Sequence, residues 1–274
     1  MTQHTQLPDY DLPYLESQIR KRLPDLAFSF FTSVTSTNDL AKELGSRADA
    51  PRQGLLLAET QTSGRGRRER SFYSPPGQGI YMTLYFKQAL DPAFAALLPF
   101  YVALSAAEAL QSFSFPVGIK WVNDLMLFDG SIERKVGGIL CESRLGPQEA
   151  LWICGLGINV AETAISFPAA IEGSAGTLVK AQQAANGLPD RLREDLVLAI
   201  TDKIINKIYN PGYYMAEYKR YCLSLNREVE VKNFSGEMYT AYVVDLDEEG
   251  HLLVCDCFGV TRSLATEEIS ILHG

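Results

Sequence analysis

The residues with the greatest chemical potential form an arginine-rich segment. Positions 64–70 read Gly-Arg-Gly-Arg-Arg-Glu-Arg, with four arginines and one glutamate in seven residues. Such dense positive charge repels itself unless an anion compensates it. Arginine offers a planar fork of donors that matches phosphate and carboxylate oxygens, and glycine lets the backbone approach a ligand closely. The pattern is typical of a loop that folds over an anionic ligand, but a solvated surface loop or an RNA-binding patch has the same composition.

A second group of polar residues interrupts apolar, strand-like sequence. Asn123 and Asp124 divide the segment 120–128, which reads Lys-Trp-Val-Asn-Asp-Leu-Met-Leu-Phe. A carboxylate there has the chemistry of an Mg²⁺ ligand, because Mg²⁺ binds one or two carboxylates and keeps its phosphates and waters. A turn is the alternative, since Asn-Asp is turn-prone. Lys135 opens a glycine-containing strand, where its ammonium points into a pocket or into solvent.

The hydrophobic pattern predicts the elements that must position these residues. Strands are predicted at 26–34, 54–59, 79–87, 117–121, 124–128, 135–142 and 149–159. Helices are predicted over 12–23, from the Ser36 cap to Gly45, from Asp91-Pro92 to about Phe113, from an Asp190 cap to Tyr209, and from Asn210-Pro211 onward. The mixture of hairpins and helices favours an α+β fold, a mixed sheet flanked by helices, over a doubly wound parallel sheet.

The C-terminal part of the chain has a different hydrophobic pattern. Five short alternating strands are predicted, at 227–233, 238–245, 251–256, 260–264 and 268–272. Five strands in about fifty residues are typical of a small β-barrel. The chain is therefore divided into an N-terminal tail and short helix (1–25), a main domain (26–222) and a barrel (223–274).

Composition excludes several classes of protein. The 274 residues are 46% hydrophobic and 21% charged, with a net charge of −8, so general affinity for nucleic acid is not expected. Five cysteines without a CxxC pair indicate reduced thiols rather than zinc or disulfides. No apolar run is long enough to span a membrane and no signal-peptide pattern begins the chain, so we expect a cytoplasmic protein. The segment before residue 26 is too short for a helix-turn-helix domain, so no DNA partner is expected.

The order and spacing of the motifs together resemble the biotin protein ligase family. The resemblance is carried by Ser36-Thr37-Asn38, Gln61 with the 64–70 loop, Lys120–Leu125, Lys135–Leu140, Gly155–Asn159 and the C-terminal strands that follow Asn226-Arg227. It covers roughly residues 26–274. It implies a class II synthetase-like catalytic domain with a small SH3-like β-barrel. The implied activity is ATP-dependent formation of biotinoyl-AMP, followed by transfer of biotin to a lysine of a carboxylase's biotin carboxyl carrier protein.

The resemblance also implies a role for each matching residue. Biotin would be bound by Ser36, Thr37, Gln61, Gly64, Arg65, Arg67, Lys135, Gly138 and Gly155. ATP would be bound by Arg65, Arg67, Arg70, Trp121, Asn123, Lys135 and Asn159, with Asn159 reaching the adenine. The catalytic residues would be Lys135, Arg67 and Asp124, and Asp124 would hold Mg²⁺ and is a candidate base in the transfer step.

Two positions depart from the family pattern, and two other functions remain open. The family usually has glycine where this chain has Glu69, which makes the loop less flexible, and proline where it has Val122. A lipoate or octanoate ligase or transferase has a related fold and similar acyl chemistry. A non-catalytic RNA-binding module would use the same arginine loop. Members of the family include monomers and dimers that pair along a sheet edge, so a homodimer is one of two expected states.

Overall fold

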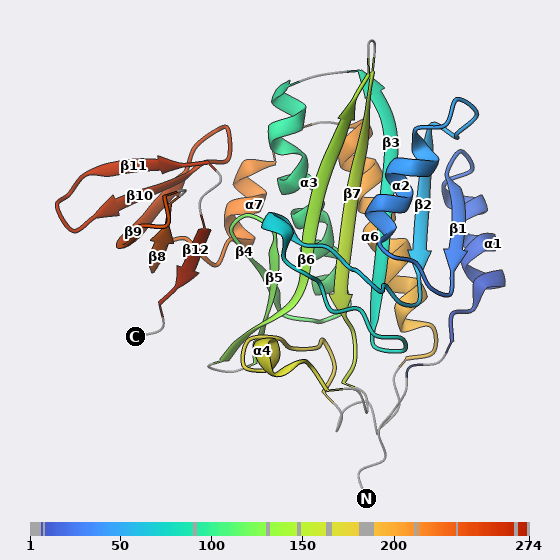
Figure 1. The fold of residues 1–274 in the computed structure, drawn as a ribbon, viewed down its shortest axis with the longest axis horizontal. Coiled ribbons are helices and arrows are strands. Elements are labelled where there is room, and N and C mark those ends of the chain that lie inside the picture. Colours follow the sequence, from blue (N-terminus) through green and yellow to red (C-terminus); the bar gives the residue numbers. More distant parts are fainter. Residues whose placement is uncertain are drawn as a thin grey trace, which may run out of the picture.

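The chain folds around a seven-stranded mixed sheet (Figure 1). The computed structural model describes residues 7, 9–89, 92–129, 132–146, 149–162, 166–180, 189–210, 212, 214–233, 235–265 and 268–272. The strands, in spatial order, are β1 (Ala27–Phe31), β2 (Gln53–Ala58), β3 (Gly79–Ala89), β7 (Glu149–Asn159), β6 (Ile132–Leu145), β5 (Asp124–Asp129) and β4 (Val117–Lys120). Only β1 and β2 run parallel among these neighbours, so the predicted mixed sheet and α+β class are confirmed.

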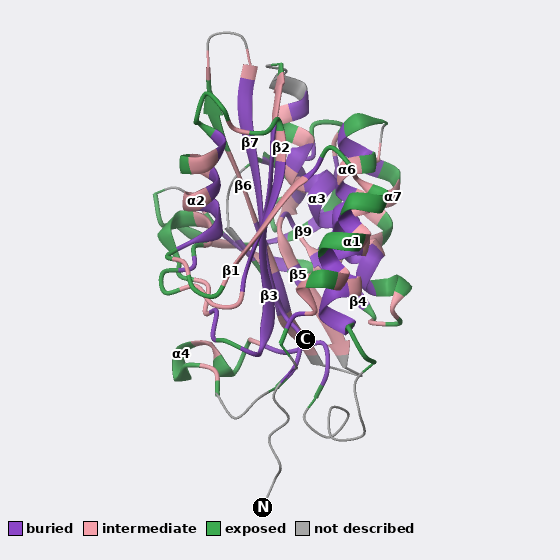
Figure 2. Cartoon of the chain, turned by 90° about the vertical axis from the view of Figure 1, so that its right-hand side faces the viewer, coloured by how far each residue is buried: buried purple, intermediate pink, exposed green. Residues whose placement is uncertain are grey.

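Helices cover both faces of this sheet (Figure 2). On one face lie α1 (Leu12–Arg22), α3 (Pro92–Ser112), α6 (Leu192–Tyr209) and α7 (Met215–Tyr221). Helix α3 is long and apolar enough to cross a membrane, but 67% of its apolar window is buried inside the molecule, as in the core helix of a folded domain. The opposite face carries α2 (Thr37–Gly45), and the short helix α4 (Ala169–Glu172) lies beyond one end of the sheet.

Helix α2 begins where the sequence predicted. The Ser36 hydroxyl accepts a hydrogen bond from the Asp39 N–H at 3.5 Å, as an N-cap residue does. Its inner side packs on a small apolar cluster in the sheet that includes Leu56, Tyr85 and Ile153. This packing fixes the helix start, and with it the Ser36-Thr37-Asn38 segment, against the middle of β3 and β7.

The C-terminal strands form a separate antiparallel sheet. They are β8 (Glu228–Lys232), β9 (Met238–Leu246), β10 (Leu252–Asp256), β11 (Thr261–Leu264) and β12 (Glu268–Ile271), in the spatial order β11-β10-β9-β8-β12. A hydrogen bond joins this sheet to the main unit. The Trp121 indole N–H donates to the carbonyl of Gly250, between β9 and β10, at 3.0 Å. Five strands agree with the predicted SH3-like unit, whereas the division of the chain at residue 222 remains a prediction.

Two predicted helix starts are wrong. Helix α6 is preceded by Arg191 as its N-cap residue, with positive φ and no side-chain capping bond, so Asp190 is not the cap. Helix α7 starts at Met215 rather than at Asn210-Pro211. Pro211, like Asp91 at the predicted start of an earlier helix, lies outside the described residues.

Candidate functional site

A cavity of about 550 Å³ lies over the sheet, between α2 and the C-terminal unit. Its walls come from the start of α2, the arginine loop, strands β5 to β7, the α4 turn and strand β12. Six cationic side chains and two carboxylates line it: Arg65, Arg67, Arg68, Arg70, Lys120 and Lys135, with Asp124 and Glu133. The cavity therefore has a strongly cationic wall in a protein whose net charge is −8.

Strand register places the chemical residues in rows on one face of the sheet. Lys120 pairs with Asp124, Asp124 with Gly138, and Gly138 with Gly157. Residues directly opposite each other in neighbouring strands point to the same face. The next row pairs Leu140 with Gly155. Glycines thus form the floor of the cavity, while the polar side chains stand at one side of it.

A β-bulge turns Lys135 toward this floor. Lys135 and Gly138 are three positions apart, which in a regular strand would put them on opposite faces. The register shifts because Met126 pairs with Lys135 while the adjacent Leu125 pairs with Gly137, which leaves Val136 as an extra residue. A Cβ atom added to Gly138 would lie 3.6 Å from Lys135 Nζ, so the ammonium lies directly over that glycine.

The absence of side chains at two glycines makes room for specific neighbours. A Cβ at Gly157 would come within 2.6 Å of Cζ of Phe72, whose ring therefore lies on this glycine at the end of the arginine loop. A Cβ at Gly155 would lie 2.8 Å from the amide carbon of Asn38. Both positions show the close approach that strand glycines often mark.

One end of the cavity is lined by uncharged hydrogen-bonding groups. The Thr37 N–H and hydroxyl both donate to Gln61 Oε1, at 2.9 and 3.0 Å. The buried Thr83 hydroxyl lies 2.8 Å from the Thr37 hydroxyl and 2.7 Å from Asn38 Oδ1. The Asn38 amide in turn donates to the Leu140 carbonyl at 3.1 Å. This connected, ordered set suits recognition of a neutral polar ring, as expected for Thr37 and Gln61.

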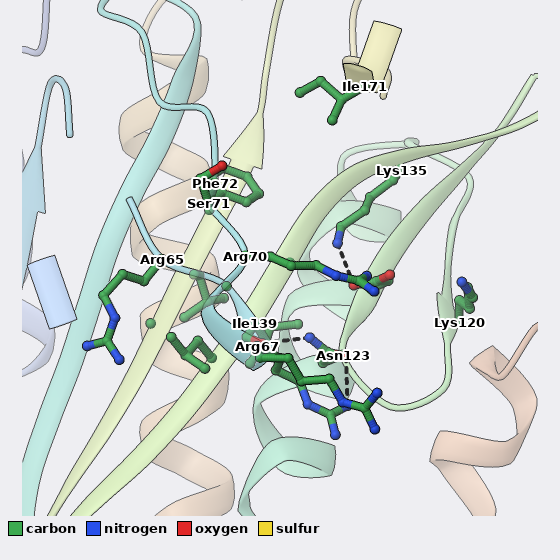
Figure 3. Close-up of a pocket in the computed structure, with 18 of the residues that line it drawn as sticks. Arg65, Arg67, Arg70, Ser71, Phe72, Lys120, Asn123, Lys135, Ile139 and Ile171 are labelled. Atoms are coloured by element: carbon green, nitrogen blue, oxygen red, sulfur yellow. Dashed lines mark hydrogen bonds and ion pairs between the residues drawn. The ribbon is translucent and has the colours of Figure 1, made fainter. Parts of the chain in front are cut away.

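The other end holds the groups suited to phosphate chemistry. The Lys135 ammonium forms an ion pair with Asp124 at 2.7 Å. Burial lowers the pKa of Lys120, and the neighbouring Lys135 and Arg70 lower it further against the opposing effect of Asp124. A partly buried cation with other cations nearby gains from an incoming anion. Figure 3 shows Arg70 and Lys135 pointing toward the same space.

The arginine loop is folded over the cavity in an unusual backbone conformation. It contains the short 3₁₀ helix η1 (Arg67–Glu69), in which Arg68 and Glu69 have φ values of 54° and 60°. Arg67 donates to Asn123 Oδ1 at 3.2 Å, and Asn123 donates to the Ile139 carbonyl at 2.9 Å. Burial, with Arg68 and Arg70 nearby, lowers the pKa of Arg67. The side chain nevertheless stays cationic and is desolvated, as expected for an anion-binding arginine.

Arg65 points away from the other cations of the loop (Figure 3). Its guanidinium forms ion pairs with Asp39 and, at 3.3 Å, with Glu142. The structure therefore brings Arg65 to the edge of the cavity but directs its charge to two protein carboxylates. A direct contact from Arg65 to a ligand remains a prediction.

Most of the residues singled out in the sequence meet in this cavity. It is lined by Ser36, Thr37, Gln61, Arg65, Arg67, Arg70, Trp121, Asn123, Asp124, Lys135, Gly138 and Gly155. Gly64 and Asn159 are not among its lining residues; the buried Asn159 amide donates instead to the Gly176 carbonyl at 3.0 Å. The structure thus gives no support to the predicted contact between Asn159 and adenine.

Several lining residues were not assigned a role from the sequence. Lys120, Asn38, Phe72 and Ile269–Ile271 all line the cavity. Lys120 and Asn38 lie inside motifs that were recognised, so their polarity was the available signal. Strand β12, which contains residues 269–271, lies more than a hundred positions from the other strands of the site, and local pattern carries no sign of that proximity.

Comparisons with known proteins show similarity to biotin and lipoate ligases. Residues 30–159 match the family described as the Biotin/lipoate A/B protein ligase family. The bifunctional ligase/repressor BirA of Bacillus spizizenii is 27% identical over 226 residues, 81% of this chain and 67% of that protein. The biotin–[acetyl-CoA-carboxylase] ligase of Mycobacterium tuberculosis is 28% identical over 228 residues, 79% of each chain.

A solved structure has the same overall arrangement. The biotin protein ligase from Aquifex aeolicus in complex with biotin and ATP superposes with a TM-score of 0.67 at 25% identity, covering 90% of this chain and 99% of that one. The fold is thus shared along 90% of this chain. The chain is therefore similar to the Biotin/lipoate A/B protein ligase family over residues 30–159, and to biotin ligases of Mycobacterium tuberculosis and Aquifex aeolicus over most of its length.

Proposed function

We propose that this protein is a biotin protein ligase, which joins biotin to AMP and passes the biotinyl group to a lysine of a biotin carboxyl carrier protein. One observation carries the proposal. A single cavity has neutral hydrogen-bonding groups, Thr37 and Gln61, at one end and a cationic cluster around Lys135 at the other. Such a cavity matches a ligand with a polar ring, an apolar chain and a carboxylate.

The first step must bring two anions together. The biotin carboxylate oxygen attacks the α-phosphorus of ATP, the new O–P bond creates the mixed acyl–phosphate anhydride, and pyrophosphate leaves with the electron pair of the broken P–O bond. Lys135 and Arg67 would neutralise the charge that gathers at the α-phosphate, and Arg70 the charge of the leaving group. Removing one such preorganised charge typically slows a reaction by a hundredfold or more, about 3 kcal/mol.

The residues present fit an Mg²⁺ ion that is held mainly by the nucleotide. Among the described residues there is no group of three or more His, Cys, Asp or Glu side chains that would cage a metal. Asp124 offers one carboxylate to the cavity, and one carboxylate with substrate phosphates is the usual Mg²⁺ arrangement. When bound, the ion would add positive charge at the phosphates, and Asp124 would orient it.

The second step needs protection from water and a proton acceptor. Phe72, which packs on Gly157, and the folded arginine loop would shield the mixed anhydride. A neutral acceptor lysine attacks the acyl carbon, and AMP leaves with the electrons of the broken acyl–oxygen bond. The proton of the attacking amine would pass to Asp124, the carboxylate beside Lys135.

The partner and setting of the enzyme extend the same proposal. The acceptor would be the carrier domain of a carboxylase; the name of the Mycobacterium tuberculosis relative gives acetyl-CoA-carboxylase as the acceptor of that protein. A cytoplasmic location and a choice between monomer and homodimer remain predictions from the sequence.

Biotin-dependent release of pyrophosphate from ATP tests the proposed function. We expect release with biotin and none with lipoate or octanoate, and we expect Lys135→Ala and Arg67→Ala to lower the rate at least a hundredfold while leaving the fold intact. Equal rates with lipoate would favour the lipoate ligase alternative. Wild-type rates from either variant would refute the assigned roles.

A further inference from the structure

We propose that Glu142 is a positioning residue for this reaction: it anchors Arg65, and thereby fixes the base of the arginine loop beside the ring end of the cavity. The inference rests on the proposed function and adds to it a residue that the recognised motifs do not contain. Glu142 follows Leu140 by two positions on β6, so both point to the α2 face of the sheet.

The two carboxylate oxygens of Glu142 have different partners. Oε1 accepts from Lys42 at 2.7 Å and from Arg65 at 3.3 Å, and Oε2 accepts from the Asn38 amide at 2.9 Å. The Glu142 side chain is 21% exposed, whereas those of Lys42 and Arg65 are 31% and 41% exposed. A carboxylate held by three donors has a fixed position, so it can act as an anchor for Arg65.

Arg65 is held from two sides. Asp39, on the first turn of α2, provides the second carboxylate. Desolvation by burial lowers the pKa of Arg65, but the charges of Glu142 and Asp39 outweigh it and raise the pKa above its ordinary value. The guanidinium is therefore stabilised by these carboxylates before any ligand is bound.

Anchoring Arg65 anchors the whole loop, because the loop is closed at its base. Arg65 and Ser71 form an antiparallel bridge, the Phe72 N–H donates to the Gly64 carbonyl at 2.8 Å, and the Gly66 N–H donates to the Arg70 carbonyl at 2.7 Å. The tip that carries Arg67 therefore extends from this hydrogen-bonded base.

The same anchor is connected to the ring end of the cavity. Asn38 donates to Glu142 and, through its Oδ1, accepts from Thr83, which also contacts Thr37. Thr37 donates to Gln61, four positions before Arg65. Glu142 thus belongs to one continuous polar network that begins at the proposed ring-binding groups and ends at the loop.

The substitution Glu142→Gln tests the anchor, because an amide keeps the size and the acceptor for Asn38 but loses the charge. Trypsin cleaves after arginine, so the loop itself reports its mobility without any substrate. We expect cleavage within residues 65–70 of the ligand-free protein to be about five- to tenfold faster in Glu142→Gln than in the wild type. The KM for biotin should rise by a similar factor, while kcat changes less than threefold.

Glu149→Gln is the matched control. It removes the same charge from a Glu–Arg pair, Glu149–Arg52 at 2.8 Å, on the neighbouring strand β7 and outside the cavity. This control should cleave and react like the wild type. Cleavage and KM of Glu142→Gln equal to those of Glu149→Gln would overturn the proposal. Asp39→Asn, which removes the second carboxylate, should act in the same direction and serves if Glu142→Gln does not fold.

A double-mutant cycle separates anchoring from general damage. If Glu142 acts through Arg65, Glu142→Gln should raise the KM by less than twofold in an Arg65→Gln background. Effects that multiply independently would contradict the positioning role. Because proteolysis needs no biotin, the anchor is tested even if the wild-type protein shows no biotin-dependent pyrophosphate release, a result that would refute the proposed function instead.

Discussion

The Lys135 ammonium lies 2.7 Å from the Asp124 carboxylate, across the β5–β6 hairpin at the edge of the cavity. The cation that the reaction requires for a substrate carboxylate is therefore already paired with a carboxylate of the protein. Side-chain exposures of 39% for Lys135 and 22% for Asp124 leave both groups reachable by a ligand. Substrate binding must weaken this pair, and that requirement has a measurable consequence.

Asp124→Asn should separate binding from catalysis. Freeing Lys135 from its partner should leave the Kd for biotin unchanged or lower it up to about fivefold, since a partly exposed ion pair contributes at most about 1 kcal/mol. Pyrophosphate release should fall about a hundredfold, because the carboxylate proposed to orient Mg²⁺ is lost. Parallel biotin titrations and rate assays check both values. Biotin binding weakened as strongly as the rate would argue against Asp124 as a competitor of the ligand.

Gly155→Ala should damage the ring end of the cavity. A Cβ there collides with Asn38, which is held by Leu140, Glu142 and Thr83 and cannot move freely. Overpacking of this kind costs about 1–3 kcal/mol, so we expect a KM for biotin that is roughly five- to 150-fold higher. Gly173→Ala is the control, since Gly173 lines the same cavity but has no atom within 4 Å of an added Cβ. A normal KM in Gly155→Ala would show that Asn38 is not part of the pocket wall.

Glu69→Gly should favour the folded loop. Glu69 has φ of 60°, in the left-handed region that costs a non-glycine residue about 1–2 kcal/mol. Glycine removes this cost, but its greater backbone freedom in the open loop offsets part of the gain. The net effect should be about 1 kcal/mol, or roughly fivefold tighter binding of biotin with ATP. Glu69→Ala removes the charge but keeps the Cβ. Equal affinities of these two variants would mean that charge, not backbone conformation, limits closure.

The pH dependence of stability should report the contact between α7 and β9. A hydrogen bond from Lys219, at 2.6 Å, and one from the Leu246 N–H hold the pKa of Asp245 below its ordinary value of 3.8. A carboxylate with a lowered folded pKa stabilises the fold above its unfolded pKa and loses that contribution as pH falls through the folded value. Solvent screening of this half-exposed pair limits the contribution to about 1 kcal/mol or less.

Asp245→Asn should therefore be slightly less stable than the wild type at pH 7, with the difference shrinking below pH 4. Urea unfolding of both proteins across this range measures it. Lys219→Met should lower the stability at pH 7 by a similar amount. A difference that stays constant from pH 7 to below pH 3 would point to a cause other than the ionised carboxylate.

The sequence was sufficient to predict the helices and strands, but not the exact residues at which each of them begins. Ser36 capped its helix as predicted, and every strand of the main sheet was anticipated within a few residues, because capping and alternation are local signals. Asp190 was a plausible cap by residue type, yet the helix is preceded by Arg191 in the left-handed conformation. Side-chain type alone does not determine the backbone angles at such a boundary.

In the cavity, the sequence identified the residues but not the directions in which their side chains point. Lys135 was identified by residue type and motif, whereas its direction depends on the bulge at Val136, which appears only in the pairing of β5 with β6. Arg65 was predicted to face a ligand, but Asp39 and Glu142 hold its charge at the edge of the cavity. Long-range pairing decides both outcomes, and a local sequence pattern does not contain it.

Calorimetric titration of biotin into the protein, with and without ATP and Mg²⁺, tests the central claim most directly. The account predicts one saturable biotin site per chain, a further heat of reaction when ATP and Mg²⁺ are present, and no binding of lipoate under the same conditions. Absence of biotin binding, or equal binding of lipoate, would contradict the claim that this cavity brings the carboxylate of biotin to a nucleotide.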